Sequence, residues 1–278
     1  MLPPVECDSV TARMRALYVD LDGTLLGPGA SLLRGAEDRF SLDAVRALQA
    51  CDRAGAEVVI YSGRRQSSVF ESARLIGCSS YIFEIGCGLV IDGELEWLTD
   101  GLEPRDGQTI FEQITATGLP ALLLERFAGR LEYHTPWHLG RDVSHLFRGH
   151  VNTAEAIELV APHGLRLVDN GVIHEAVGQV GIVHAYHLIP AGASKARGVA
   201  RHMQARGYER TDCIAVGDSR EDLEAASVLD TFWLVANAPR RDPGMAEEIA
   251  GRPGIRIAEG SYGAGVYEAV ITTLAEHR

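Results

Sequence analysis

Short apolar segments that alternate with amphipathic ones constrain the fold of this chain more than any other feature. The stretch ALYVDL at residues 16–21 is apolar and ends in acidic residues, which is typical of a buried strand that runs into a loop. Apolar residues at helical spacing follow at 41–55, and the strand-like AEVVIYSG, a helix-like segment at 64–77 and the strand-like YIFEIG come next. Strands and helices in this alternation predict a parallel sheet with helices on its faces.

The alternation stops after Gly86. The segment GLVIDGELEWL then predicts an antiparallel hairpin, and short strands and helices mix in the sequence that follows it. The strand–helix pattern resumes with a helix at 194–207, the strand DCIAVGD, the helix REDLEAASVL and the strand TFWLVANA. We therefore predict an α/β protein in two parts. A Rossmann-like parallel-sheet core is formed by residues 1–86 and 190–278, and an α+β cap domain is inserted at 87–189.

Composition narrows the functional class. The chain has 278 residues and a formal net charge of −12, which argues against a protein that coats nucleic acid or lies on a membrane surface. The first residues contain no long apolar region, so we expect no signal peptide. No apolar stretch approaches the roughly eighteen residues of a membrane span. The five cysteines are far apart and form no C-x-x-C pair, so we expect free thiols in a cytoplasmic protein.

The first motif with chemical content is Asp20-Leu21-Asp22-Gly23-Thr24, directly after an apolar strand. Two carboxylates two residues apart can point into one site at the carboxyl end of that strand, where open α/β sheets bind ligands. One carboxylate can then act as a nucleophile while the other transfers a proton. An acidic turn that caps the next helix is the structural alternative.

Two further motifs could hold an anion. Ser62-Gly63-Arg64 lies at a strand end before a helix, so a hydroxyl and helix N–H groups could form a small anion site, unless Ser62 is only a helix cap. Lys195 is the only lysine of the chain and opens a predicted helix, where the helix dipole disfavours a cation. A compact ammonium with three donors suits contact with a phosphate oxygen and a carboxylate together, and chance is the alternative.

The fourth motif is Gly217-Asp218-Ser219-Arg220-Glu221-Asp222, again between a strand and a helix. Carboxylates clustered at a strand end suit Mg²⁺, which prefers a few acidic ligands together with water and substrate phosphate. An ordinary acidic first helical turn is the alternative interpretation.

Together the four motifs resemble the haloacid dehalogenase superfamily of aspartate-nucleophile phosphotransferases. The insert lies between the second and third motifs, as the larger cap does in the Cof-like, or type IIB, branch. Within that branch, the segments at 217–230 and 235–238 are similar to mannosyl-3-phosphoglycerate phosphatases and related sugar-phosphate phosphatases. The chain departs from the branch at Glu221 and at Ile85, since asparagine is frequent at both positions.

The resemblance implies a role for each motif residue. Asp20 would form an aspartyl-phosphate, and Asp22 would protonate the leaving alcohol and then activate water. The resemblance further implies that Mg²⁺ is held by the Asp20 carboxylate, the Asp22 backbone carbonyl and Asp218, with Asp222 as a ligand directly or through water. Phosphate oxygens would be held by Leu21, Ser62, Gly63 and Lys195.

The expected activity is Mg²⁺-dependent hydrolysis of a small phosphorylated metabolite, such as a sugar phosphate or a glycosyl-3-phosphoglycerate. The alternatives are a phosphomutase of the same fold and a catalytically silent binding protein on this scaffold. No nucleic-acid or membrane partner is expected.

Eight of the ten histidines lie in the insert. We expect a cationic and aromatic lid to recognise the substrate, with a solvated surface segment as the alternative; its candidate residues are His134, Trp137, His138, Arg141 and Arg148.

Overall fold

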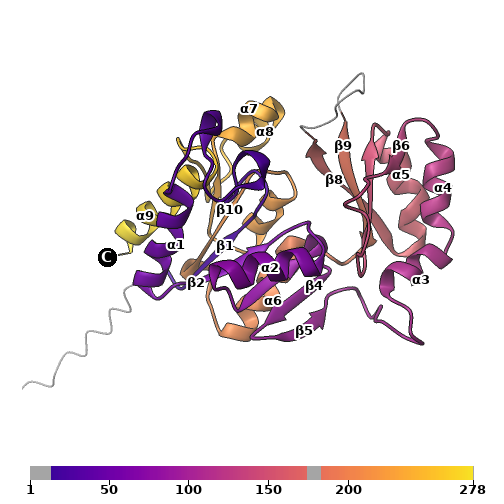
Figure 1. Ribbon diagram of the computed structural model, residues 1–278, viewed down its shortest axis with the longest axis horizontal. Coiled ribbons are helices and arrows are strands. Elements are labelled where there is room, and N and C mark those ends of the chain that lie inside the picture. Colours follow the sequence, from indigo (N-terminus) through magenta and orange to yellow (C-terminus); the bar gives the residue numbers. More distant parts are fainter. Residues whose placement is uncertain (1–13, 174–182, 278) are drawn as a thin grey trace, which may run out of the picture.

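The computed structural model describes residues 14–173 and 183–277, which form two β-sheets flanked by helices (Figure 1). Four cysteines in these residues are free thiols, as expected, and Cys7 lies outside them. None of the helices within the described ranges combines the length and the apolar character needed to cross a membrane.

The larger sheet has eight strands in the order β12-β11-β10-β1-β2-β3-β4-β5. Neighbouring strands from β12 to β3 are all parallel, and β4 and β5 are added antiparallel at one edge. The predicted parallel α/β core is therefore confirmed. Its strands are β1 (Ala16–Val19), β2 (Glu57–Tyr61), β3 (Ser80–Phe83), β4 (Gly88–Ile91), β5 (Glu94–Trp97), β10 (Cys213–Gly217), β11 (Thr231–Leu234) and β12 (Ile255–Ile257).

Helices cover both faces of this sheet because the strands are apolar on both sides. One face buries a cluster with α1, α2 and α9, and α1 and α9 lie side by side in Figure 1. The opposite face packs against α6 and α8. The core helices are α1 (Asp43–Ala54), α2 (Gln66–Ile76), α6 (Lys195–Arg206), α7 (Asn237–Arg241), α8 (Pro243–Ile249) and α9 (Gly263–Glu276).

The smaller sheet forms the cap and is antiparallel in the order β6-β7-β9-β8. Its helices pack on one face through a separate apolar cluster and lie on the side away from the core in Figure 1. The cap elements are α3 (Ile110–Ala116), α4 (Leu119–Arg126), β6 (Leu131–Tyr133), β7 (His145–Gly149), α5 (Thr153–Val160), β8 (Leu165–Val172) and β9 (His184–Pro190).

Several segments differ from the sequence predictions. The hairpin β4–β5, expected in the insert, extends the large core sheet instead. Strand β7 and helix α4 were not predicted, since polar residues interrupt the apolar pattern of β7. The segment Asp222–Ser227 is a 3₁₀ helix where a longer helix at 220–229 was expected.

Candidate active site

The carboxyl ends of three neighbouring strands bring the sequence motifs to one place. β1 lies between β10 and β2, and all three strands run parallel. Asp20, Ser62 and Asp218 each follow directly the last residue of one of these strands. Since open α/β sheets bind ligands at this edge, we take it as the candidate active site.

Lys195 lies at the centre of this site. It is the first residue of α6, which the Ser194 side chain caps. The Lys195 ammonium donates hydrogen bonds to Asp20 Oδ1 at 2.8 Å and to Asp222 Oδ1 at 2.6 Å. Glu221 Oε2 lies 3.3 Å from the same nitrogen, and Lys195 is only 2% exposed. The ammonium is therefore a counter-ion shared by three buried carboxylates.

Three acidic residues could hold a metal ion. Asp20, Asp218 and Asp222 each offer a carboxylate oxygen within 4.8 Å of the other two. Asp222 Oδ2 is fixed by the Ser219 hydroxyl at 2.7 Å and by the N–H groups of Ser219 and Asp218 at 3.0 and 3.1 Å. Gly217 makes this arrangement possible, because a Cβ atom there would lie 2.3 Å from Asp222 Cβ.

Burial disfavours the ionised forms of the Asp20 and Asp218 carboxyl groups. Burial, followed by the charges of Asp222 and Asp218, raises the pKa of Asp20 well above its usual value, although Lys195 opposes this. Burial raises the pKa of Asp218 to about 6, against the attraction of Arg241, whose Nη2 lies 2.6 Å from Asp218 Oδ2. A crowded set of oxygen donors that outnumbers the neighbouring cations Lys195 and Arg241 fits Mg²⁺, whose charge would favour the ionised carboxylates.

Burial also disfavours the charged form of Lys195 itself. The negative charges of Asp20, Asp222 and Glu221 outweigh that effect and raise the Lys195 pKa well above its usual value. Glu221, one of the two departures from the resembling branch, is 3% exposed, and burial raises its pKa to about 7. Its carboxylate therefore adds to the excess of acidic groups around the ammonium.

The second aspartate of the first motif lies at the rim. The Asp22 side chain is 52% exposed. Arg64 donates hydrogen bonds to both of its carboxylate oxygens, from Nε to Oδ2 at 2.6 Å and from Nη2 to Oδ1 at 2.5 Å. Gly23 follows with φ +88°, and a Cβ atom there would lie 2.2 Å from Asp218 Oδ2. The glycine is therefore what allows this loop to approach the Asp218 carboxylate.

The predicted phosphate-binding residues surround the same point. Leu21 is buried directly after Asp20, and Ser62 is 1% exposed with its Oγ accepting a hydrogen bond from the Arg64 N–H at 3.2 Å. Gly63 packs so closely that an added Cβ would lie 3.0 Å from Ile85 Cδ1. Ile85, the second departure, thus forms an apolar wall beside this loop.

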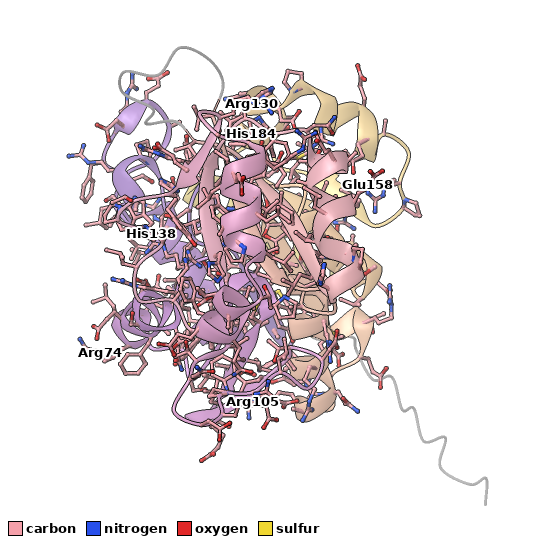
Figure 2. All side chains as sticks on the ribbon, turned by 90° about the vertical axis from the view of Figure 1, so that its right-hand side faces the viewer. Arg74, Arg105, Arg130, His138, Glu158 and His184 are labelled. Atoms are coloured by element: carbon pink, nitrogen blue, oxygen red, sulfur yellow. The ribbon has the colours of Figure 1, made fainter. Side chains whose placement is uncertain are left out.

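The candidate cap residues occupy different environments. Arg141 is buried against the core, where it donates to the Gly63 carbonyl. Burial lowers the pKa of the half-buried His134 to about 4. His138, labelled in Figure 2, stacks on Tyr133 with ring centroids 4.9 Å apart. The other two candidates lie further toward solvent: Arg148 pairs with Glu132 on the cap sheet, and Trp137 is 63% exposed.

Several residues around the site had no role assigned from the sequence. Arg64 belongs to the second motif, but the motif did not indicate its partner, because Asp22 lies 42 positions away. Arg241, Glu84 and His187 carried no local signal. His187, on cap strand β9, is 2% exposed and its Nδ1 has no hydrogen-bond partner among the described residues. Its Nε2 faces Gly63, where an added Cβ would lie 3.4 Å from it.

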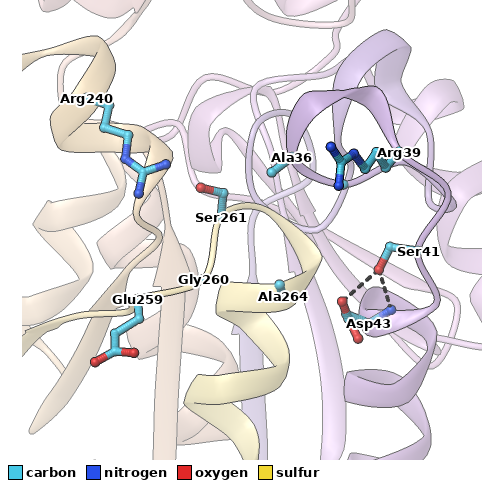
Figure 3. Close-up of a pocket in the computed structure, with 10 residues that line it drawn as sticks. Ala36, Arg39, Ser41, Asp43, Arg240, Glu259, Gly260, Ser261 and Ala264 are labelled. Carbon is cyan, nitrogen blue, oxygen red and sulfur yellow. Dashed lines mark hydrogen bonds between the residues drawn. The ribbon is translucent and has the colours of Figure 1, made fainter.

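A separate pocket of about 380 Å³ lies on the core, apart from the acidic cluster (Figure 3). It is lined from the segment before α1, from α7 and from the turn before α9, with Arg39, Arg240 and Ser261 among its polar groups. None of the motif residues lines it, so it is not the candidate active site.

Comparison with known proteins agrees with the four motifs, although no family model matches the chain. A phosphoglycolate phosphatase from Pyrobaculum neutrophilum is 29% identical over 262 residues, covering 92% of this chain and 94% of the relative. Sucrose-phosphatase from Synechocystis, solved with sucrose and phosphate, superposes with a TM-score of 0.64 at 16% identity, covering 94% and 98% of the two chains. A phosphatase of the haloalkanoate (HAD) enzyme superfamily from Bacteroides thetaiotaomicron gives a TM-score of 0.63 at 17% identity, covering 98% of each chain.

The chain therefore resembles haloacid dehalogenase superfamily phosphatases in its motifs and its fold, and its sequence is similar to phosphoglycolate phosphatases along nearly its whole length. These relatives and the four motifs both indicate an enzyme of the phosphoric monoester hydrolase class.

Proposed function

We propose that this protein is a Mg²⁺-dependent phosphatase of the haloacid dehalogenase superfamily, which hydrolyses a small phosphorylated metabolite through an aspartyl-phosphate on Asp20. The observation that carries the proposal is the contact of Lys195 with Asp20 and Asp222. The carboxylate oxygens of these two residues and of Asp218 lie within 4.8 Å of one another. Phosphoryl transfer depends mainly on in-line positioning and on neutralising the charge of the equatorial oxygens. A buried set of charges in fixed positions can provide both the positioning and the neutralisation.

The reaction would proceed in two displacements. An Asp20 carboxylate oxygen attacks phosphorus, the bond from phosphorus to the ester oxygen breaks, and Asp22 donates a proton to the leaving alkoxide. Asp22 then takes a proton from a water molecule that attacks the aspartyl-phosphate, and the bond from phosphorus to the Asp20 oxygen breaks. Inorganic phosphate leaves and Asp20 is regenerated.

The remaining motif residues would bind charge. The non-bridging phosphate oxygens would be held by the Ser62 hydroxyl, the N–H groups of Leu21 and Gly63, and the Lys195 ammonium. Bound by Asp20, Asp22, Asp218 and Asp222, Mg²⁺ would supply positive charge that neutralises the phosphate and these carboxylates.

The substrate class is supported by the cap and by the relatives. Arg65 Nη1 donates to the Leu139 carbonyl of the cap at 2.7 Å, so the cap loop lies against the rim of the site. A covered rim favours a small metabolite over a phosphoprotein. Eight relatives are named phosphoglycolate phosphatase, and a structural neighbour is a sucrose-phosphatase. We therefore propose a phosphorylated hydroxy acid or sugar, with phosphoglycolate tested first and a glycosyl-3-phosphoglycerate beside it.

The test is phosphate release from a panel that contains phosphoglycolate, sugar phosphates, mannosyl-3-phosphoglycerate, nucleotides and phosphopeptides, with Mg²⁺ or with EDTA. Release from small phosphate esters only with Mg²⁺ is expected. Activity restricted to phosphopeptides or nucleotides would contradict the substrate class. Release that requires a sugar bisphosphate would favour the phosphomutase, and no Mg²⁺-dependent turnover would favour the silent binding protein.

Asp20→Asn tests the nucleophile directly. The amide cannot form the aspartyl-phosphate, so kcat should fall by about 10³-fold or more while the fold is retained. Asp52→Asn, at an exposed position of α1, is the matched control and should keep full activity. An Asp20→Asn variant that keeps a tenth of the activity would exclude Asp20 as the nucleophile.

A further inference from the structure

We propose that Arg141 of the cap is a positioning residue that orients both Ser62 and Asp22 by fixing the peptide group between Gly63 and Arg64. The inference rests on the proposed function, since it assigns Ser62 to the phosphate and Asp22 to proton transfer. Arg141 of the cap contacts Gly63 of the core, which lies 78 positions away in the sequence.

The Arg141 side chain binds protein atoms on nearly all its donors. Nη1 and Nη2 both donate to the Gly63 carbonyl at 3.1 Å, Nη1 also donates to Ser144 Oγ at 2.7 Å, and Nε donates to the Trp137 carbonyl at 3.1 Å. The residue is 8% exposed. A planar guanidinium held at four contacts has a defined orientation, so it defines the direction of the Gly63 carbonyl.

That direction determines the position of the next N–H group. In a trans peptide, the carbonyl of Gly63 and the N–H of Arg64 lie in one plane and point to opposite sides. The N–H of Arg64 donates to Ser62 Oγ at 3.2 Å. Because Ser62 Oγ accepts this bond, its own proton is left to donate elsewhere, in the proposed function to a phosphate oxygen. Arg141 therefore acts on the Ser62 hydroxyl through one rigid peptide group.

The same peptide group carries the side chain that holds Asp22. Arg64 forms two parallel hydrogen bonds with the Asp22 carboxylate, at 2.6 and 2.5 Å. Bidentate pairs of this kind fix the plane of the carboxylate as well as its distance. A rotation of the Gly63–Arg64 peptide would move the start of the Arg64 side chain and, with it, Asp22.

Glu84 anchors the cap loop that carries Arg141. This fully buried carboxylate accepts hydrogen bonds from the N–H groups of Asp142, Val143 and Ser144 at 2.8, 3.2 and 2.6 Å, and from the Ser144 hydroxyl at 2.7 Å. Its own backbone N–H donates to the Arg64 carbonyl at 3.0 Å. Glu84 thus joins the two loops from the core side, and Arg141 joins them from the cap side.

The decisive experiment compares Arg141→Lys with Arg130→Lys, an exposed arginine of the cap that is labelled in Figure 2. A lysine ammonium cannot span the Gly63 carbonyl, Ser144 and the Trp137 carbonyl together. The variants are assayed for kcat/KM on an alkyl phosphate substrate and on p-nitrophenyl phosphate, whose leaving group needs no proton. We expect Arg141→Lys to lower kcat/KM about 30-fold for the alkyl ester and only about 3-fold for the aryl ester. The reason is that kcat/KM reports the first displacement, in which a misplaced Asp22 matters only where the leaving group needs a proton.

The outcomes are distinguishable from failure of the proposed function. A wild-type protein without phosphatase activity would refute the proposed function, whereas an active wild type with an unchanged Arg141→Lys variant would refute only the positioning role. An equal loss on both esters would also refute it, since that loss indicates general damage. If Arg141→Lys does not fold, Ser144→Ala removes one of the four guanidinium contacts and should show the same preference for the aryl ester to a smaller degree. A Ser144→Ala variant without that preference would refute the role.

Discussion

At the scale of single residues, charge balance around Lys195 dominates the site. Three carboxylates lie within 3.3 Å of its ammonium, and none of them is more than 5% exposed. Buried carboxylates of this kind need a fixed positive neighbour in addition to hydrogen bonds. The Tyr61 ring, 4.9 Å from the Lys195 nitrogen, closes another side of the space. The shape of this space therefore matters as much as the charge.

Lys195→Arg keeps the charge and changes the shape. A planar guanidinium is larger than an ammonium and cannot place one nitrogen 2.8 Å from Asp20 and 2.6 Å from Asp222 in the same way. We expect kcat to fall by about 100-fold or more, with a lower melting temperature. Steady-state kinetics and thermal unfolding measure both quantities. Arg197→Lys, two residues further along α6 with its side chain at the surface, serves as the control. A Lys195→Arg variant with a tenth of the wild-type kcat would show that the ammonium is replaceable.

The site residues that directly follow a strand could be predicted from the sequence. The site residues that contact them from distant parts of the chain could not. Asp20, Ser62 and Asp218 are recognisable because a polar residue directly after an apolar strand lies at one known edge of the sheet. The sole lysine stood out against an otherwise arginine-only background. Arg141 was expected to face the substrate, but its donors are bound mainly to protein carbonyls and a serine hydroxyl, which only the folded contact of cap and core reveals.

At the scale of elements, the cap sheet illustrates how a polar residue can hide a strand. β7 contains His145 and Arg148, so its sequence lacks the apolar run expected of a central strand. His145 is nevertheless fully buried: it stacks on Phe111 with ring centroids 3.8 Å apart and lies 3.1 Å from the Tyr133 hydroxyl. Its ring nitrogens are satisfied inside the cap, which makes a histidine compatible with the interior.

This burial makes the cap sensitive to acid. Burial first, and the charge of Arg141 in addition, lower the pKa of His145 to about 4. The unfolded chain binds the proton more readily, so the stabilising contribution is complete above pH 6.5 and is lost as pH falls toward 4. The loss is at most about 3 kcal/mol.

His145→Gln removes the titrating group and should flatten the pH dependence of stability. Urea unfolding between pH 7 and pH 4.5 measures it, and the variant should lose less free energy of unfolding across this range than the wild type. His163→Gln, at an exposed position of the same cap, should keep the wild-type slope. Equal slopes for His145→Gln and wild type would mean that His145 does not contribute to the acid sensitivity.

At the scale of the whole molecule, the chain contains two apolar clusters around the large sheet and a third inside the cap. The sequence predicted a boundary between two parts after Gly86, whereas the large sheet continues through β5 to Trp97. The turn residues of a hairpin predict that its two strands pair with each other, but they do not predict which sheet the hairpin joins. Here β4 pairs with the edge of β3, which exists only once the core has folded. The acidic cluster belongs entirely to the core part.

Metal binding should therefore stabilise the core. If Mg²⁺ binds the acidic cluster only in the folded chain, a concentration of one hundred times Kd adds about 2.7 kcal/mol. For a chain of this size, that free energy corresponds to a rise in melting temperature of roughly 5 to 10 °C relative to EDTA. Fluorescence reports on the core, since Trp233 is 5% exposed there while the cap residue Trp137 is 63% exposed.

Asp218→Asn decides whether the stabilisation comes from this site. The variant loses one carboxylate of the cluster and should lose most of the Mg²⁺-dependent shift, whereas Asp52→Asn should keep all of it. NaCl at the same ionic strength controls for screening of surface charges, which would raise the melting temperature without any specific ligand. A shift that survives in Asp218→Asn, or that NaCl reproduces, would contradict metal binding at the acidic cluster. A shift confined to proteins with an intact cluster would connect the stability of the whole core to the same charges that are proposed to carry out catalysis.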